Sequence, residues 1–78
     1  MDCVHPKLDR ITFNPDKCGG KACIRGLRMT VEALVGYLAS GMSHEELLQE
    51  WPDLAEEDIL QALRYAAWTT SEHVVEVA

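Results

Sequence analysis

The stretch from Gly19 to Thr30 constrains the fold most, because a strand-like pattern gives way there to a helical one. It reads Gly-Gly-Lys-Ala-Cys-Ile-Arg-Gly-Leu-Arg-Met-Thr and holds three of the five glycines of the chain. Gly19 and Gly20 can take positive φ angles at little steric cost, and Gly26 indicates a second bend. We therefore expect a tight turn at Gly19 and Gly20 that joins two short strands.

A short strand is expected on each side of this turn. Residues 10–13 alternate polar and apolar side chains, which predicts a strand with Ile11 and Phe13 facing inward. Pro15 ends it, because proline fixes its own φ and pushes the residue before it toward an extended or turn conformation. Residues 22–24 can pair as a second strand.

A helical period of apolar residues follows the glycine-rich stretch. Its positions at i, i+3, i+4 and i+7 are Val31, Leu34, Val35 and Leu38. Thr30 suits the N-cap of this first helix, and Gly41 suits a left-handed stop after it. Ser43 with Glu46 forms a capping-box pattern that predicts a short second helix, which Pro52 ends.

A third helix is expected from Asp53, which offers a cap, to about Trp68. The aromatic residues expected to anchor the core or a dimer are Trp51, Tyr65 and Trp68. The chain of 78 residues then divides into an N-terminal arm (1–10), one domain (11–68) and a C-terminal tail (69–78). These elements predict a mainly α fold, a trihelical helix-turn-helix core with a short N-terminal β-hairpin or β arm.

Charge is distributed unevenly along the chain. The net charge is −6, but residues 1–30 carry +3 whereas residues 31–78 carry −9. A polyanion would therefore be attracted only to the first third of the chain.

Basic side chains of that first third are the candidates for nucleic-acid contact. The expected third helix starts with three carboxylates, at residues 56–58. Its only side chains that could read bases or bind phosphates are Gln61 and Arg64. Arg25 and Arg28 could instead pair with carboxylates of the acidic half, and the sequence leaves this choice open. The candidate nucleic-acid-binding residues are Lys17, Lys21, Arg25, Arg28, Gln61 and Arg64.

Catalysis and metal binding find little support in the sequence. An odd number of cysteines favours reduced thiols. Four side chains carry groups that can bind zinc, namely Cys3, His5, Cys18 and Cys23. A metal site formed by them is the alternative to thiols that are simply packed in the protein. Their spacing is not one of the common zinc spacings, and no nucleophile lies in a pattern with a base, so we expect no enzyme, no metal and no cofactor. No apolar run approaches a membrane span, so we expect a cytoplasmic protein without a membrane partner.

Four pieces of the chain carry a family resemblance. They are residues 11–14, Gly19-Gly20-Lys21-x-Cys23-Ile24-Arg25-Gly26-x-Arg28, residues 31–43, and Trp51-Pro52-x-Leu54 with Asp58-Ile59. Through them, residues 11–68 resemble a widespread bacterial and archaeal family of small domains of unknown function, often described as VapB-type antitoxins. The resemblance implies a homeodomain-like helix-turn-helix fold, a homodimer and a PIN-like ribonuclease toxin as partner. The family usually has Ser or Thr where Ala55 stands, which leaves the cap of the third helix to Asp53 or to packing.

The leading hypothesis from the sequence is the antitoxin-like component of a toxin–antitoxin pair. Such a dimer would bind a nuclease toxin through its arm or through Ser71 to Ala78, whose Glu72 and Glu76 could approach a basic or metal-dependent site. It could also bind operator DNA through the basic arm. The alternative is a protein-interaction or dimerisation module with no nucleic-acid role.

Overall fold

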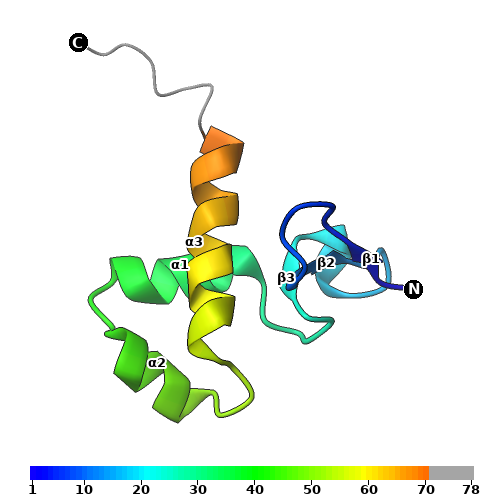
Figure 1. The fold of residues 1–78 in the computed structure, drawn as a ribbon. Coiled ribbons are helices and arrows are strands. Elements are labelled where there is room, and N and C mark those ends of the chain that lie inside the picture. Colours follow the sequence, from blue (N-terminus) through cyan, green and yellow to red (C-terminus); the bar gives the residue numbers. More distant parts are fainter. Residues whose placement is uncertain (71–78) are drawn as a thin grey trace, which may run out of the picture.

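The computed structural model describes residues 1–70, in which a small sheet stands beside three helices (Figure 1). The elements in chain order are β1 (Cys3–Val4), β2 (Ile11–Phe13), the 3-10 turn η1 (Cys18–Gly20), β3 (Cys23–Ile24), α1 (Val31–Ala39), α2 (His44–Glu50) and α3 (Glu56–Thr70). The expected toxin-docking segment, Ser71 to Ala78, lies outside the described residues.

The sheet has three antiparallel strands in the order β1-β2-β3. Cys3 pairs with Phe13 across β1 and β2, and Ile11 pairs with Ile24 across β2 and β3. The expected mainly α fold with a short β arm is therefore wrong, and the protein has an α+β arrangement. A strand as short as β1 shows no alternation in the sequence, because its conformation comes from pairing with β2 rather than from local propensity.

The glycine turn lies where the sequence predicts it. Gly19 has a φ of 66° and Gly20 a φ of 81°, and Cys18 before them is also left-handed, with a φ of 50°. Gly26 is left-handed too, and a Cβ atom there would lie 2.5 Å from Oδ2 of Asp2. Glycine is therefore needed at this second bend for its backbone angle, whereas the Asp2 carboxylate ends a flexible, exposed side chain that can move aside.

Two of the three helix starts are confirmed. The Thr30 hydroxyl accepts from the amide of Ala33 at 3.0 Å, and Ser43 with Glu46 makes both hydrogen bonds of a capping box. The expected cap of α3 by the Asp53 side chain is absent among the described contacts, since the amide of Ala55 donates instead to Oδ2 of Asp58 at 2.8 Å.

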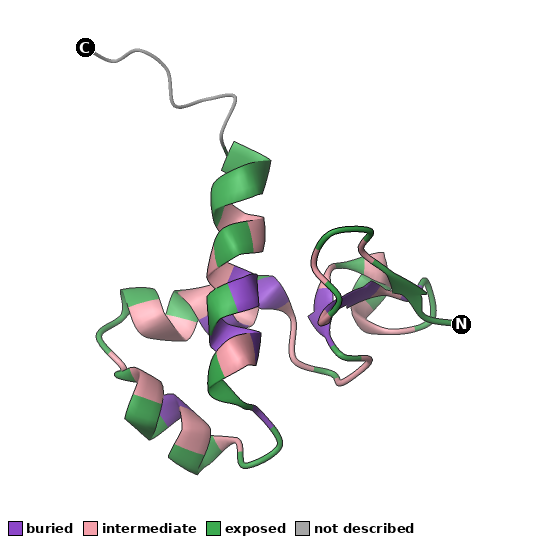
Figure 2. Ribbon diagram, in the orientation of Figure 1, coloured by how far each residue is buried: buried purple, intermediate pink, exposed green. Residues whose placement is uncertain are grey.

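The core lies where the sheet meets the three helices, and the buried parts of α3 are in its first half (Figure 2). It comprises Ile11, Ile24, Val31, Leu34, Leu47, Leu54, Ile59 and Ala62. The last turns of α3 are largely exposed, and Trp68, an expected anchor, is 63% exposed. None of the helices within residues 1–70 is long and apolar enough to cross a membrane.

Two glycines allow a matched test of the helix assignments. A Cβ atom at either Gly36 or Gly41 would meet no atom within 4 Å, but Gly36 lies inside α1 whereas Gly41 has a φ of 109°. We expect Gly36→Ala to raise the free energy of unfolding by about 0.4–1 kcal/mol, because alanine restricts the unfolded chain. Gly41→Ala should lower it by about 1 kcal/mol or more, since alanine does not tolerate that φ. Urea denaturation at two chain concentrations measures both, and equal effects would contradict the assignment.

Candidate functional site

The carboxylate of Asp58, in the first turn of α3, is completely buried and receives four hydrogen bonds. Nε and Nη2 of Arg25 each donate to it at 2.9 Å, and Nη1 of Arg10 donates at 3.0 Å. The amide of Ala55 supplies the fourth bond. Nη2 of Arg25 also donates to the backbone carbonyl of Asp53. This arrangement ties the strands to the start of α3.

The charge of Asp58 is stabilised by these donors. Burial by itself would raise the pKa of this carboxyl, but the hydrogen bonds from Arg25, Ala55 and Arg10 outweigh burial and hold the pKa below its ordinary value. Asp58 in turn raises the pKa of the Arg25 guanidinium. Both groups are therefore charged at neutral pH.

Gln61 lies one turn after Asp58 and is also buried. Its Oε1 accepts from the amide of Arg10 at 2.8 Å, and its Nε2 donates to Oδ1 of Asp9 at 2.8 Å. The amide group predicted to read bases thus holds the loop before β2 against α3. Both its donor and its acceptor are engaged inside the protein.

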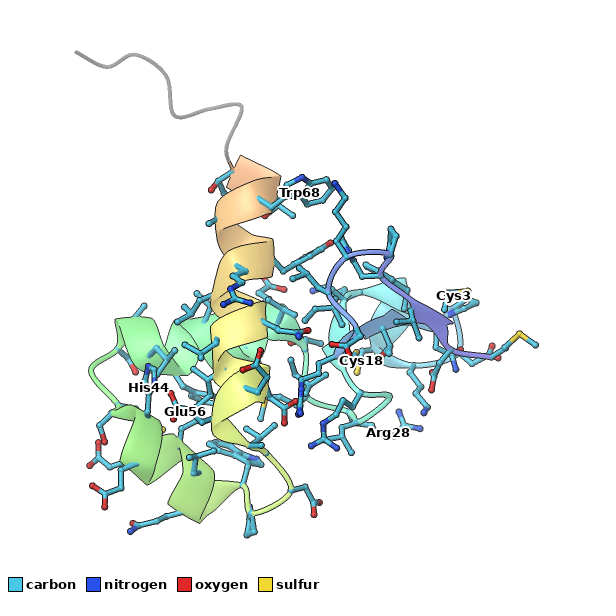
Figure 3. All side chains as sticks on the ribbon, in the orientation of Figure 1. Cys3, Cys18, Arg28, His44, Glu56 and Trp68 are labelled. Carbon is cyan, nitrogen blue, oxygen red and sulfur yellow. The ribbon has the colours of Figure 1, made fainter. Side chains whose placement is uncertain are left out.

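Most of the other predicted nucleic-acid-binding residues also contact the protein itself. Nζ of Lys17 donates to the carbonyl of Gly26 at 2.7 Å, and Lys21 pairs with Glu32 at 2.9 Å on the surface. Nη1 of Arg64 lies 4.0 Å from a carboxylate oxygen of Glu57, a weak surface pair. Arg28 is exposed and has no hydrogen bond or ion pair within residues 1–70 (Figure 3). Nucleic-acid binding by these residues stays a prediction.

The candidate metal ligands differ in their surroundings. Cys3 is exposed, Cys18 is half-buried and Cys23 is buried. Burial, together with the neighbouring Cys18 thiol, raises the pKa of Cys23 to about 11, which makes it a poor nucleophile at neutral pH. Within residues 1–70 no group of three or more His, Cys, Asp and Glu side chains is placed to hold a metal ion.

A groove between the N-terminal loop and the second half of α3 was missed by sequence reasoning. We call it the aromatic groove. It encloses about 630 Å³ and is lined by His5, Pro6, Lys7, Leu8, Phe13, Arg64, Tyr65 and Trp68. The spacing of Tyr65 and Trp68 is a signal for an apolar helix face, but nothing in the sequence shows which loop lies opposite.

The imidazole of His5 organises one wall of this groove. Its Nδ1 accepts from the amides of Lys7 at 3.0 Å and Leu8 at 3.2 Å, which fixes the ring on its loop. The ring meets Tyr65 and Trp68 edge-on, with centroids 5.8 and 5.6 Å apart. The groove is therefore shaped in advance by backbone hydrogen bonds and aromatic contacts.

A second groove, the α1–α3 groove, lies between those two helices and encloses about 490 Å³. Tyr65 contributes to both grooves, so the second half of α3 borders a hollow on each side. The α1–α3 groove is lined by Lys21, Ala22, Val31, Glu32, Val35, Gly36, Ala39, Tyr65, Ala66 and Thr69. Its lining is mostly small or apolar, which suits close packing against another protein segment rather than catalysis.

Comparison with known proteins places the chain among relatives whose functions are not described. The family model "Protein of unknown function (DUF433)" matches residues 11–66. An uncharacterized protein of Sinorhizobium fredii, y4eO, is 39% identical over 66 residues, which cover 85% of this chain and 30% of the relative. The crystal structure of a DUF433 member from Anabaena variabilis has a TM-score of 0.73 and 38% identity, and the match covers 82% of this chain and 62% of that one. The chain thus spans less than a third of the curated relative that it matches.

Removal of the buried charge tests the role of Asp58. We expect Asp58→Asn to lower the free energy of unfolding at pH 7 by about 3 kcal/mol, because Arg10 and Arg25 lose their shared partner. This loss lies at the low end of the range for breaking a buried ion pair, because the two arginine side chains are 33% and 37% exposed. Because the folded-state pKa of Asp58 is lowered, its contribution is complete above the ordinary aspartate pKa of about 4 and is lost as the pH falls through the folded value. The variant should lack this portion of the acid sensitivity.

Asp53→Asn is the matched control for this experiment. The hydrogen bond from Arg25 to Asp53 goes to the backbone carbonyl, so the substitution leaves it in place and removes only a weaker attraction between the Asp53 carboxylate and the guanidinium. Urea denaturation of the three proteins between neutral and strongly acidic pH measures both effects. Equal stability of Asp58→Asn and Asp53→Asn at pH 7 would contradict the role assigned to the buried carboxylate.

Proposed function

We propose that this chain, which belongs to the DUF433 family of proteins of unknown function, binds another protein. In this proposal the chain is a non-enzymatic, antitoxin-like component of a toxin–antitoxin pair, and its partner is a PIN-like ribonuclease. The partner would dock in the aromatic groove. The single observation that carries the proposal is this preformed apolar groove beside the exposed Trp68.

The lining of the aromatic groove indicates what kind of segment would bind there. Its walls are apolar or aromatic, and among residues 1–70 its charged members are Lys7 and Arg64 and no carboxylate lines it. A segment with apolar side chains flanked by Asp or Glu would therefore be complementary. A large exposed tryptophan in such a place is typical of residues that contribute most to protein–protein binding.

Operator DNA has less support as a partner. A helix-turn-helix protein reads bases with the N-terminal residues of its recognition helix. At this end of α3, Asp58 is buried beneath Arg10 and Arg25, while Glu56 lies 2.7 Å from Nδ1 of His44 (Figure 3). The carboxylates of Glu56 and Glu57 at this end repel phosphates, and Arg10 and Arg25 are held in hydrogen bonds to Asp58 instead of being free to contact a phosphate.

The proposal includes a homodimer that uses the α1–α3 groove. Gly36, Ala39 and Ala66 are small, so a helix of a second copy could approach closely. Lys21 and Glu32 form an exposed pair at the same groove, and a twofold axis would bring the lysine of each copy near the glutamate of the other. The charges on this surface are thus self-complementary.

Substitution of an exposed groove residue tests the dimer. We expect Ala39→Glu to raise the dimer dissociation constant at least about tenfold, because it places a carboxylate in an apolar contact. Ala67→Glu is the control, since Ala67 is exposed on α3 and lines neither groove. Sedimentation equilibrium measures both constants. Equal constants for the two variants, or a wild-type chain that stays monomeric, would remove this part of the proposal.

A second comparison separates protein binding from DNA binding. We expect Trp68→Ala to weaken inhibition of a co-encoded PIN-like ribonuclease at least about tenfold, as for a central interface tryptophan. Arg28→Glu should leave inhibition unchanged, because Arg28 lies outside the aromatic groove. Inhibition is measured as cleavage of an RNA substrate, and circular dichroism confirms that each variant is folded.

The same variants are titrated with the upstream DNA at several salt concentrations. Arg28 is the suitable residue because Arg25→Glu would also place a carboxylate against Asp58 and disturb the fold. Unchanged inhibition by Trp68→Ala, together with specific DNA binding that Arg28→Glu abolishes, would overturn the proposal in favour of operator binding.

A further inference from the structure

Two of the three cysteines meet beside the glycine turn. Cys18 opens the 3-10 turn η1, and Cys23 is the first residue of β3. The amide of Lys21 donates to the carbonyl of Cys18 at 3.2 Å, which folds the chain back on itself between the two cysteines. The thiol of Cys23 donates to the carbonyl of Lys21 at 3.4 Å, so its sulfur lies next to this turn. The thiols of Cys18 and Cys23 are close enough to share a hydrogen bond.

The third cysteine is too far from Cys23 to take the place of Cys18. Cys3 stands on β1 and pairs with Phe13, whereas Cys23 pairs with Thr12 on the other side of β2 (Figure 3). Two strand spacings therefore separate the backbones of Cys3 and Cys23, about 9–10 Å. The Cα atoms of a disulfide lie less than about 7 Å apart. Of the other two cysteines, only Cys18 is thus placed to bond Cys23.

The two neighbouring thiols differ in their access to solvent. Cys18 is half-buried, whereas Cys23 is only 2% exposed, so a dissolved reagent reaches the Cys18 sulfur first. Burial and the adjacent Cys18 thiol raise the pKa of Cys23 to about 11. The carboxylate of Asp2 acts in the same direction, and the ammonium of Lys17 opposes it. Cys23 is therefore protonated at neutral pH and reacts only after it loses that proton.

We propose that Cys18 and Cys23 are a redox-active pair that forms a reversible disulfide with a low-molecular-weight disulfide, such as oxidised glutathione, as the oxidant. Cys18 loses its proton to solvent, and its thiolate attacks one sulfur of the oxidant, which forms a mixed disulfide and releases one thiolate of the reagent. Cys23 then loses its proton, attacks the Cys18 sulfur and displaces the second reagent thiolate. The pair thus gives up two electrons and two protons, and the oxidant is reduced to two thiols.

The bond would close the chain over residues 18–23, which include the turn at Gly19 and Gly20. Lys21 and Ala22 stand inside this loop and also line the α1–α3 groove. Oxidation would therefore restrain one wall of that groove. The thiol chemistry is measured on the chain alone, so this inference stands or falls independently of the proposed function.

Thiol counting in glutathione buffers tests the pair. The full-length chain carries Cys3→Ser, because the exposed Cys3 could otherwise cross-link two copies. Free thiols are blocked by alkylation, and the mass of the intact chain is measured. We expect the two remaining thiols to disappear together, with no glutathione bound, and to return when dithiothreitol is added. Two thiols that stay free in oxidised glutathione, or a bound glutathione that persists to the end of the reaction, would overturn the proposal.

Single-cysteine variants separate the roles of the two thiols. In the Cys3→Ser background, Cys23→Ala leaves Cys18 alone, and this chain should retain one glutathione because no second thiol displaces it. Cys18→Ala leaves Cys23 alone, which should react at least about tenfold more slowly, since it is buried and protonated. Equal rates would refute this order of attack. Circular dichroism checks the fold of both variants, and the counting experiment does not depend on them.

The pH dependence of the closing step identifies Cys23 as the attacking thiol. The mixed disulfide is formed at mildly acidic pH, and its conversion to the internal disulfide is followed by mass after a jump in pH. The rate should rise about tenfold for each pH unit between about pH 7 and pH 9, because the thiolate fraction of a group with a pKa of about 11 rises by that factor. A rate that does not change with pH would contradict attack by the buried Cys23 thiol.

Discussion

The carboxylate of Asp58 joins two parts of the molecule that are distant in sequence. Arg10 immediately precedes β2 and Arg25 immediately follows β3, so one buried group on α3 holds the pair of strands at adjacent ends. A buried charge is costly unless its lone pairs are satisfied, and here two guanidinium groups and the amide of Ala55 satisfy them. Apolar contacts alone are non-directional, whereas this geometry fixes how the sheet sits against the helices.

The charge pattern of the chain suggests nucleic-acid binding, but several of its basic residues form ion pairs within the protein, as Arg10 and Arg25 do with Asp58. The basic first third and the acidic remainder are separate along the chain, but folding brings Arg10 and Arg25 onto Asp58 and Lys21 onto Glu32. Each such pair reduces the positive potential that a phosphate backbone would meet. The apolar hollows beside α3 are then the more distinctive surface, which is why we favour a protein partner.

Local signals were predictable and long-range ones were not. The turn at Gly19, the Thr30 cap and the Ser43 capping box depend on residues within a few positions, and the structure contains all of them. β1 and the role of Asp58 depend on distant partners; Arg25 and Asp58 are 33 residues apart. One signal for Asp58 was present, because it stands three residues after Ala55, the spacing of a capping box without its serine. The aromatic groove left no such signal, since its two walls come from opposite ends of the described chain.

The second half of α3 differs physically from the first. Ala62 is its last buried residue, and beyond it the helix borders grooves rather than core. Short helices without tertiary contacts are marginal in water, so these turns depend on what packs against them. Within residues 1–70, His5 supplies such a contact, since its ring lies nearly perpendicular to the rings of Tyr65 and Trp68 and close to both. Any segment that fills the aromatic groove would add contacts to the same turns and stabilise them by binding. Occupancy of the groove and order at the end of α3 are therefore thermodynamically linked, and each should strengthen the other.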